Sequence, residues 1–171
     1  MIPRPAPSEY APYYGRYVAL VPEDDVLAFL DTQKRATQAL LKEVGEERGG
    51  HRYAPDKWSI KQVVGHLTDA ERVFAYRALV ISRSDRTPQA GFEQDDWVTK
   101  ANHDQRPLAD VAAEFAAVRE ATLSLGRSFS DEMWGRTGVA SDCSFTARAL
   151  LFIIAGHEVH HVGVLRERYL T

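Results

Sequence analysis

The sequence predicts a single all-α domain built as a four-helix bundle. This prediction rests on four amphipathic segments of roughly 20 residues, on recognisable end signals, and on the lack of any strand pattern of comparable strength. The chain has 171 residues, which is an ordinary size for one domain. We expect an N-terminal arm over residues 1–21 and the helical bundle over residues 22–171.

The arm and the first helix differ in composition. Residues 1–21 are rich in proline and tyrosine, which favours an extended segment that packs on the bundle. From Pro22 onward, apolar residues recur at three- and four-residue steps, as they do on one face of a helix. Proline is tolerated in a first helical turn, and Gly49 and Gly50 are typical of a helix end. The first long helix is therefore predicted from Pro22 to about Gly49.

The second helix has the clearest start. Ser59 is an N-cap candidate and Gln62 follows three residues later, which is the capping-box arrangement. The apolar stripe that follows consists of Ile60, Val63, Val64, Leu67, Ala70, Phe74, Ala78 and Ile81. A polar stretch from about Ser84 to Arg106 then predicts a long connection. It is either a solvated connector or, because such length is unusual in a compact domain, a functional loop.

Two further helices complete the bundle. Pro107 opens the third, whose apolar residues continue to Leu125. We expect a short helical turn after Ser130 and a loop over residues 138–144. The last helix is predicted from about Phe145 to Tyr169, with Ser144 as its cap.

Composition excludes several classes of protein. The formal net charge is -3 and the pI is near 6.1, which argues against binding to nucleic acid or to an anionic membrane. The only cysteine, Cys143, cannot form an internal disulfide and is expected to be an unreactive loop residue. No apolar run has the length of a signal peptide or a membrane span. We therefore expect a cytoplasmic protein.

Histidines interrupt the apolar stripe of the last helix. His157 and His161 occupy positions where the period requires Leu or Ile, and residues four apart differ by only about 40° in direction. Burying an imidazole without a partner costs about 1–3 kcal/mol, so something must satisfy these two side chains. His66 lies at the edge of the second helix's stripe and can also face inward.

Two interpretations of these histidines remain open. They are either hydrogen-bonded core residues or a tripod for one divalent ion, for which three imidazoles suit Zn, Ni or Fe and leave a coordination position free. His160 is rotated to another side of the helix and is expected not to be a ligand. His51 and His103 fall in loops and are expected to be solvated.

Residues 157–161 also satisfy the H-E-x-x-H pattern of zinc proteases, in which the glutamate is the general base. The motif lies within 15 residues of the C-terminus, and the longer form fails because Val164 and Glu167 stand where Gly and His are needed. No strands of a protease cleft are predicted. We therefore interpret Glu158 as an ordinary charge on the helix surface.

Two segments resemble a known family. Residues 57–71 (KWSIKQVVGHLTDAE) and residues 156–163 (GHEVHHVG) resemble the second-helix and last-helix signatures of the DinB-like bundle superfamily, particularly its YfiT-like branch. Residues 92–97 (FEQDDW) are similar to the long loop of that branch. The resemblance covers about residues 20–170.

The resemblance implies an up-down-down-up four-helix bundle with an N-terminal extended arm and a long loop between helices 2 and 3. It places the metal ligands at His66, His157 and His161. Some members are thiol transferases that use bacillithiol, mycothiol or a related low-molecular-weight thiol, others are labelled metal-dependent hydrolases, and homodimers are common. The metal is expected to be Zn or Ni, with Fe or Mn as alternatives.

Three functions follow as hypotheses. The first is transfer of a small-molecule thiol to an electrophilic substrate, since a thiol that coordinates a divalent ion is deprotonated. The second is hydrolysis by metal-activated water, with Glu158 or Asp69 as the base. The third is a non-enzymatic metal- or ligand-binding bundle that uses the long loop. Arg77 is spaced to share a face with His66, and we expect it to bind a carboxylate of the thiol cofactor.

Overall fold

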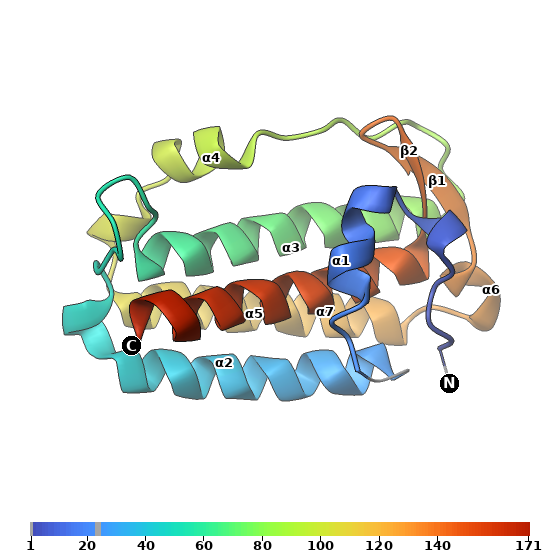
Figure 1. The fold of residues 1–171 in the computed structure, drawn as a ribbon. Coiled ribbons are helices and arrows are strands. Elements are labelled where there is room, and N and C mark those ends of the chain that lie inside the picture. The colour runs from blue at the N-terminus through green and yellow to red at the C-terminus, as the bar shows by residue number, and fades with distance from the viewer. Residues whose placement is uncertain (1, 23–24) are drawn as a thin grey trace.

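Four long helices form the body of the protein (Figure 1). The computed structural model describes residues 2–22 and 25–171, and its long helices are α2 (Val26–Arg48), α3 (Ile60–Ser82), α5 (Leu108–Arg127) and α7 (Ala147–Val164). α3 packs on α5 and α7, and α2 packs on the same two helices, so that α2 and α3 lie across the diagonal. α2 and α7 run in one direction, and α3 and α5 in the other (Figure 1). The predicted up-down-down-up bundle is confirmed.

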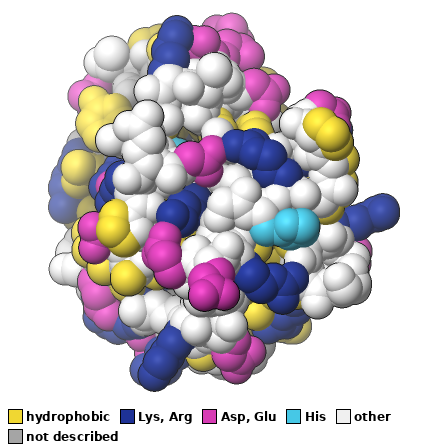
Figure 2. Space-filling view, turned by 90° about the vertical axis from the view of Figure 1, so that its left-hand side faces the viewer, with side chains coloured by type: hydrophobic (Ala, Val, Ile, Leu, Met, Phe, Trp, Pro, Cys, Tyr) yellow, Lys and Arg dark blue, Asp and Glu magenta, His cyan; other side chains and the backbone are white. Residues whose placement is uncertain are grey.

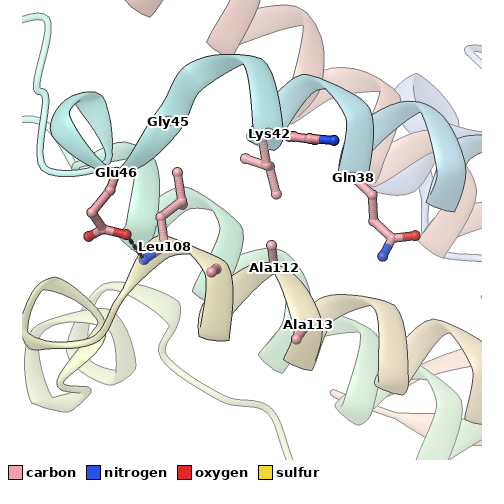
Figure 3. A pocket seen from close by; sticks show the side chains of 9 residues that line it. Gln38, Lys42, Gly45, Glu46, Leu108, Ala112 and Ala113 are labelled. Carbon is pink, nitrogen blue, oxygen red and sulfur yellow. Dashed lines mark hydrogen bonds between the residues drawn. The ribbon is translucent and has the colours of Figure 1, made fainter.

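α2 begins later than its sequence pattern predicts. Asp25 is its N-cap and accepts a hydrogen bond from the amide of Ala28 at 3.1 Å, whereas Pro22 precedes the helix. Residues 23 and 24, which fall in the predicted helix, lie outside the described residues. Near its end the helix kinks at Gly45, where φ is 70°. Figure 3 shows that this kink brings the Glu46 carboxylate to the start of α5, where it accepts the Leu108 amide at 2.5 Å.

The predicted start of α3 is confirmed. The Ser59 hydroxyl accepts the amide of Gln62 at 3.1 Å, and the Gln62 side chain accepts the amide of Ser59 at 3.0 Å. This capping box satisfies two amide groups that have no partner within the helix. It fixes the first turn of α3, from which His66 follows in the second turn.

The predicted loop over residues 138–144 is wrong, because these residues belong to a β-hairpin. Its strands are β1 (Thr137–Ala140) and β2 (Cys143–Thr146), which pair antiparallel, and φ is positive at the turn residues Ser141 and Asp142. The usual sequence signal for such a turn is a glycine, and neither turn residue is glycine here. Because β2 runs to Thr146, that residue caps α7 in place of Ser144. Before the hairpin, α6 (Asp131–Trp134) is the turn expected after Ser130.

The long connection between α3 and α5 is partly folded, although most of residues 84–97 are exposed to solvent. It contains α4 (Gln94–Lys100), which is anchored on α3 by the buried side chain of Val98, and a 3-10 turn at His103–Gln105. Upstream of α4, Gln89 joins the hairpin: its amide donates to Val139 at 3.0 Å and its carbonyl accepts from Ser141 at 2.9 Å. The connection therefore covers one side of α3.

The N-terminal arm packs across α7. It comprises 3-10 turns at Pro7–Glu9 and Pro12–Tyr14 and the short helix α1 (Gly15–Val18), which lies against α7 (Figure 1). Close approach requires glycine at position 156, because a Cβ there would lie 1.9 Å from the Tyr17 carbonyl oxygen. The Glu9 carboxylate accepts hydrogen bonds from Thr146 at 2.8 Å and from Arg148 at 2.6 Å, which fixes the start of the arm.

The core consists of two apolar clusters with a polar layer between them. One cluster lies at the hairpin end and includes Leu30, Phe74 and Ile154; the other lies at the opposite end and includes Leu41 and Phe115. Each long helix places buried polar side chains between its contributions to the two clusters. This polar layer contains Gln33, Thr37, His66, Glu71, Arg119, His157 and Glu158.

The outer surface carries mixed charges. Figure 2 shows the end of the bundle at which α7 terminates, where acidic and basic side chains are interspersed and hydrophobic ones are scattered. No helix among the described residues is long and apolar enough to cross a membrane.

Candidate metal centre

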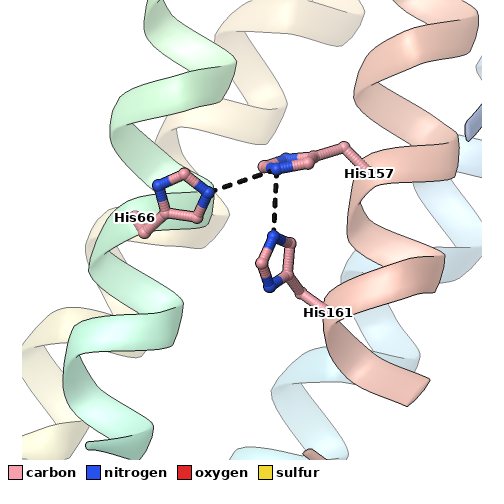
Figure 4. Close-up of side chains that lie close together, drawn as sticks. All are labelled: His66, His157 and His161. Atoms are coloured by element: carbon pink, nitrogen blue, oxygen red, sulfur yellow. Dashed lines mark hydrogen bonds between the residues drawn. The ribbon is translucent and has the colours of Figure 1, made fainter. Parts of the chain in front are cut away.

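Two imidazoles of the polar layer and the half-buried imidazole of His161 beside it converge on one point (Figure 4). The Nε2 atom of His157 lies 3.2 Å from Nε2 of His66 and 3.1 Å from Nε2 of His161. The ligand atoms of all three residues lie within 4.8 Å of one another. The sequence-predicted trio of His66, His157 and His161, here called the histidine cluster, is thus brought together by α3 and the last two turns of α7.

The donor set of the histidine cluster fits a divalent ion. Three imidazole nitrogens bound to one ion at about 2.0–2.1 Å in tetrahedral geometry lie about 3.3 Å apart, close to the two distances observed. Hydrogen bonding alone satisfies the cluster poorly. Nε2 of a neutral imidazole carries either one proton or one lone pair, and that of His157 faces two nitrogens. A shared ion uses all three lone pairs.

Burial keeps the histidine cluster uncharged. It lowers the pKa of His66 to about 4 and that of His161 to about 3, and it lowers the pKa of His157 well below the ordinary value. The neighbouring imidazoles add to the effect at His157 and His161, because each disfavours a positive charge on the next. Neutral imidazole is the form that binds a metal ion.

Aromatic side chains enclose the cluster. The Trp58 ring lies 4.9 Å from that of His66, and the Tyr17 ring of α1 lies 5.2 Å from that of His157, both measured between ring centroids. His160 is exposed and lies outside the donor set, as expected, with its ring 5.6 Å from that of Tyr17 and 5.0 Å from that of His161. The arm and the start of α3 therefore exclude water from two sides of the site.

The open side faces α4. Beside His161 lies a hollow of about 310 Å³, whose lining includes Trp58, Asp95 and Tyr169. Asp95 and Asp69 both act electrostatically on His66, where they oppose the effect of burial on its pKa. These two carboxylates are therefore candidates for accepting a proton near the cluster. Asp69 was among the bases expected from the sequence, whereas Asp95 was not, because its approach depends on the packing of α4.

The expectation for His103 is wrong. His103 is only 6% exposed, and its ring packs against α3 at Gly65, where a Cβ would lie 2.3 Å from Nε2. Its Nε2 is 3.8 Å from the Asp69 carboxylate, longer than a direct hydrogen bond. The sequence signal for this contact is Gly65, directly before His66, because a glycine leaves room for the side chain of His103. His51 is exposed, as expected.

The expectation for Glu158 is also wrong. Glu158 is 1% exposed and faces α2 and α5, where it accepts a hydrogen bond from Thr37 at 2.6 Å and pairs with Arg119 at 2.7 Å. Arg119 also pairs with Glu71 at 2.8 Å. Because its carboxylate is held in this arginine cluster (Thr37, Glu71, Arg119 and Glu158), Glu158 is not placed to serve as the general base of an H-E-x-x-H protease.

Arg77 and Cys143 lie away from the histidine cluster. Arg77 is 1% exposed; it donates to the Ala90 carbonyl at 2.6 Å and to the Ser141 hydroxyl at 3.0 Å. Its predicted contact with a cofactor carboxylate stays a prediction. Cys143 is half-buried on β2, not in a loop as predicted.

The fold and the site together define a class: a four-helix bundle with a three-histidine site between its second and last long helices, capable of holding one divalent ion. Residues 29–165 match the model of the DinB superfamily, and the chain belongs to this superfamily. It is also similar to a protein of Oceanobacillus iheyensis whose provisional name is metal-dependent hydrolase. The two are 20% identical over 139 residues, which cover 80% of this chain and 79% of the relative.

Solved structures share the fold. YfiT from Bacillus subtilis, described as a probable metal-dependent hydrolase with an unusual four-helix bundle topology, has a TM-score of 0.73 and 19% identity, covering 84% of this chain and 83% of its own. A mycothiol-dependent maleylpyruvate isomerase has a TM-score of 0.69 and 11% identity over 85% of this chain and 61% of its own. The DinB-like YjoA from Bacillus subtilis has a TM-score of 0.60 and 20% identity, covering 82% and 86%.

Proposed function

We propose that this protein is a divalent-metal-dependent enzyme that transfers a low-molecular-weight thiol to an electrophile. The observation that carries the proposal is the convergence of three neutral imidazoles, two buried and one half-buried, on one point with one side open toward α4. An ion held there by three protein ligands would keep a position free for a reactant. When bound, such an ion lowers the pKa of a coordinating thiol or water and acts as a Lewis acid.

The residues of the chain have separate tasks in this proposal. His66, His157 and His161 hold the ion, and burial keeps them in the metal-binding form. Trp58 and Tyr17 cover the imidazoles and exclude water. The electrophile enters through the hollow beside His161, where Asp95 lies at the wall.

The position of Glu158 removes one general base from the hydrolytic mechanism and thereby supports thiol transfer. Hydrolysis at a metal site usually needs a general base next to the ion, and the arginine cluster holds Glu158 away from that role. A thiol that coordinates a divalent ion loses its proton without such a base. The chain needs no cysteine of its own for this chemistry.

Metal-dependent hydrolysis is the second candidate, and the positions of Asp69 and Asp95 favour it. Both carboxylates act on His66, so either can accept a proton from water near the ion. The names of the relatives in Oceanobacillus iheyensis and Bacillus subtilis also point to hydrolysis.

One experiment separates the two candidates. The metal-loaded protein is incubated with monochlorobimane and one of several thiols (bacillithiol, mycothiol, glutathione or cysteine), and in parallel with a series of activated esters and amides. We expect acceleration of the conjugation by at least one thiol, lost in His157→Ala and retained in His160→Ala. Ester or amide cleavage that is lost in Asp69→Asn or Asp95→Asn, with no thiol conjugation, would replace the first candidate by the second. If neither activity is observed, the remaining hypothesis is a non-enzymatic binding protein.

The proposal extends to assembly and metal choice. We propose a homodimer, which light scattering of the purified protein tests. Zn and Ni are the proposed ions, with Fe and Mn as alternatives, because three imidazoles suit these metals.

A further inference from the structure

A second hollow lies on the other side of α4, along the outer face of α3. Its volume is about 480 Å³, which is enough for a small organic molecule. It is lined by four residues of α3 and by the segment leading into α4: Asp69, Arg72, Val73, Tyr76, Arg77, Gln89, Ala90, Gly91, Phe92 and Trp97. We call it the arginine hollow, because Arg77 is its distinguishing residue.

Arg77 is a buried cation without a carboxylate partner. Its Nη2 donates hydrogen bonds to Ala90 and Ser141, whereas Nη1 has no hydrogen-bond partner among residues 2–22 and 25–171. The Tyr14 hydroxyl interacts with the guanidinium but carries no charge at neutral pH. Burial lowers the pKa of Arg77, yet arginine stays protonated in proteins.

Arg119 provides a comparison, because it is a buried arginine whose role is structural alone. Both arginines are 1% exposed, but Arg119 pairs with Glu71 and Glu158, whereas no described carboxylate forms an ion pair with Arg77. Burying an uncompensated charge is costly. Because Arg77 lines a hollow that is open to solvent, an anion that enters the hollow can supply the missing charge.

The other walls indicate the chemistry of the rest of the ligand. The rings of Phe92 and Trp97 pack at a tilt of 41° with their centroids 4.9 Å apart, and Trp97 and Tyr76 remain 42% and 58% exposed. Exposed aromatic side chains beside a hollow favour an apolar or aromatic partner. The second cation at the wall, Arg72, is already paired with Asp69 and Glu114, so Arg77 is the charge available for an anion.

Arg77, at the inner edge of the arginine hollow, lies on the same face of α3 as His66 of the histidine cluster. Arg77 follows His66 by eleven residues, which corresponds to about 16 Å along the helix and a difference of only about 20° in direction. Asp69, at the near end of the hollow, acts electrostatically on His66. A ligand anchored at Arg77 therefore extends along α3 toward the metal centre.

We propose that the arginine hollow binds an amphipathic organic acid, whose carboxylate pairs with Arg77 and whose apolar body packs on Phe92 and Trp97. We propose further that this acid is a reactant of the metal centre. The second statement rests on the proposed function, whereas the first does not.

The test measures binding by calorimetry with phenylacetate, phenylpropionate and phenylbutyrate, each beside its uncharged primary amide. We expect at least one acid to bind about tenfold more tightly than its amide, and Arg77→Gln to remove this difference. Arg72→Gln is the matched control, because Arg72 also lines the hollow but is already paired with carboxylates. This variant should keep the difference in affinity between acid and amide. Trp97→Ala should weaken the acid and its amide alike. Equal binding of acid and amide to the wild type, or binding of none of the acids, overturns the proposal.

Arg77 joins three segments, so Arg77→Gln is checked by circular dichroism. If this variant does not fold, Val73→Asp provides the test, because a carboxylate placed in the hollow should abolish binding of the acids and leave the amides bound. Retention of acid binding in Val73→Asp contradicts the proposal. The same titrations in His157→Ala separate the two proposals. Acid binding that persists there shows a carboxylate site whatever the metal centre does, and an active metal centre without acid binding removes this inference alone.

Discussion

Two groups of largely buried polar side chains lie on different faces of α7, and they are built in different ways. In the arginine cluster, Arg119 is paired with Glu71 and Glu158, and Thr37 donates a further hydrogen bond, so that opposite charges meet inside the cluster. In the histidine cluster, three imidazoles of like kind point at one another, and burial keeps them uncharged. The two clusters meet at adjacent residues, Glu158 and His157.

The different composition of the two clusters indicates different roles: the arginine cluster stabilises the fold, and the histidine cluster serves function. A cluster whose carboxylates share a buried arginine finds its partners within the protein, and it stabilises one arrangement of the four helices. In the histidine cluster the nitrogen lone pairs converge, so they are satisfied only when a non-protein group such as a metal ion occupies the centre. Because H-E-x-x-H distributes its residues between both clusters, the motif in this chain places two imidazoles in the histidine cluster and its glutamate in the arginine cluster.

Removal of Arg119 should have the largest effect on stability. Arg119→Met leaves Glu71 and Glu158 buried without a counter-charge, and we expect a loss of about 3–5 kcal/mol in the free energy of unfolding, measured by urea denaturation. Arg72→Met, at an exposed ion pair, should cost less than about 1 kcal/mol. Folded Arg119→Met should still bind metal. Loss of metal from a variant of unchanged stability would show that the two clusters act as one.

The histidine cluster should make the metal-free protein sensitive to acid. The pKa of His66 is about 4 in the folded chain but 6.5 in the unfolded chain, so the unfolded state binds more protons between these values. Stability is therefore full above pH 6.5 and falls as the pH drops toward 4, by up to about 3 kcal/mol from His66.

The measurement is urea unfolding of chelator-treated protein across this pH range. His66→Leu should flatten the pH profile, whereas His51→Gln, which alters an exposed histidine, should leave it unchanged. An identical profile in wild type and His66→Leu would mean that His66 is not buried in the neutral form.

Gly156→Ala should disturb the cover of the histidine cluster. The added methyl would lie 1.9 Å from the Tyr17 carbonyl oxygen, so α1 must move off α7 and Tyr17 must leave His157. Overpacking of this kind costs about 1–3 kcal/mol. Gly163→Ala on the same helix, where nothing lies within 4 Å, should be neutral or slightly stabilising. Thermal unfolding compares the two, and equal melting temperatures would contradict the close contact between α1 and α7.

Ser59→Ala should have the smallest effect. The variant loses the capping hydrogen bond at the start of α3 and should cost about 1 kcal/mol by urea denaturation. The metal content should stay that of the wild type, since His66 lies beyond the first turn. If metal is lost although the helix persists by circular dichroism, the capping box positions His66 directly.

Features carried by local pattern could be predicted from the sequence. The capping box at Ser59 and the histidines in the stripe of α7 are such features, because helix periodicity places residues four apart on one face. The partner of Glu158 could not be found in this way, since Arg119 comes from a helix distant in sequence. Its position one helical turn after the buried Phe115 was nevertheless a signal of an inward-facing charge.

The parts that could not be predicted depend on contacts between segments. The hairpin has no glycine at its turn, and it is held by Gln89 from the connection before α4. His103 is buried because Gly65 leaves room for its ring, and Asp95 approaches His66 because Val98 anchors α4. No periodicity within one segment reports such contacts.

The central claim is tested most directly by the metal content per chain, measured by elemental mass spectrometry on protein purified without an affinity tag or chelator. The account predicts about one divalent ion per chain in the wild type. The ion should be lost in His66→Ala and His157→Ala, whose helical content by circular dichroism persists, and kept in His160→Ala. Absence of metal from the wild type even after reconstitution, or equal loss in His160→Ala, would contradict it.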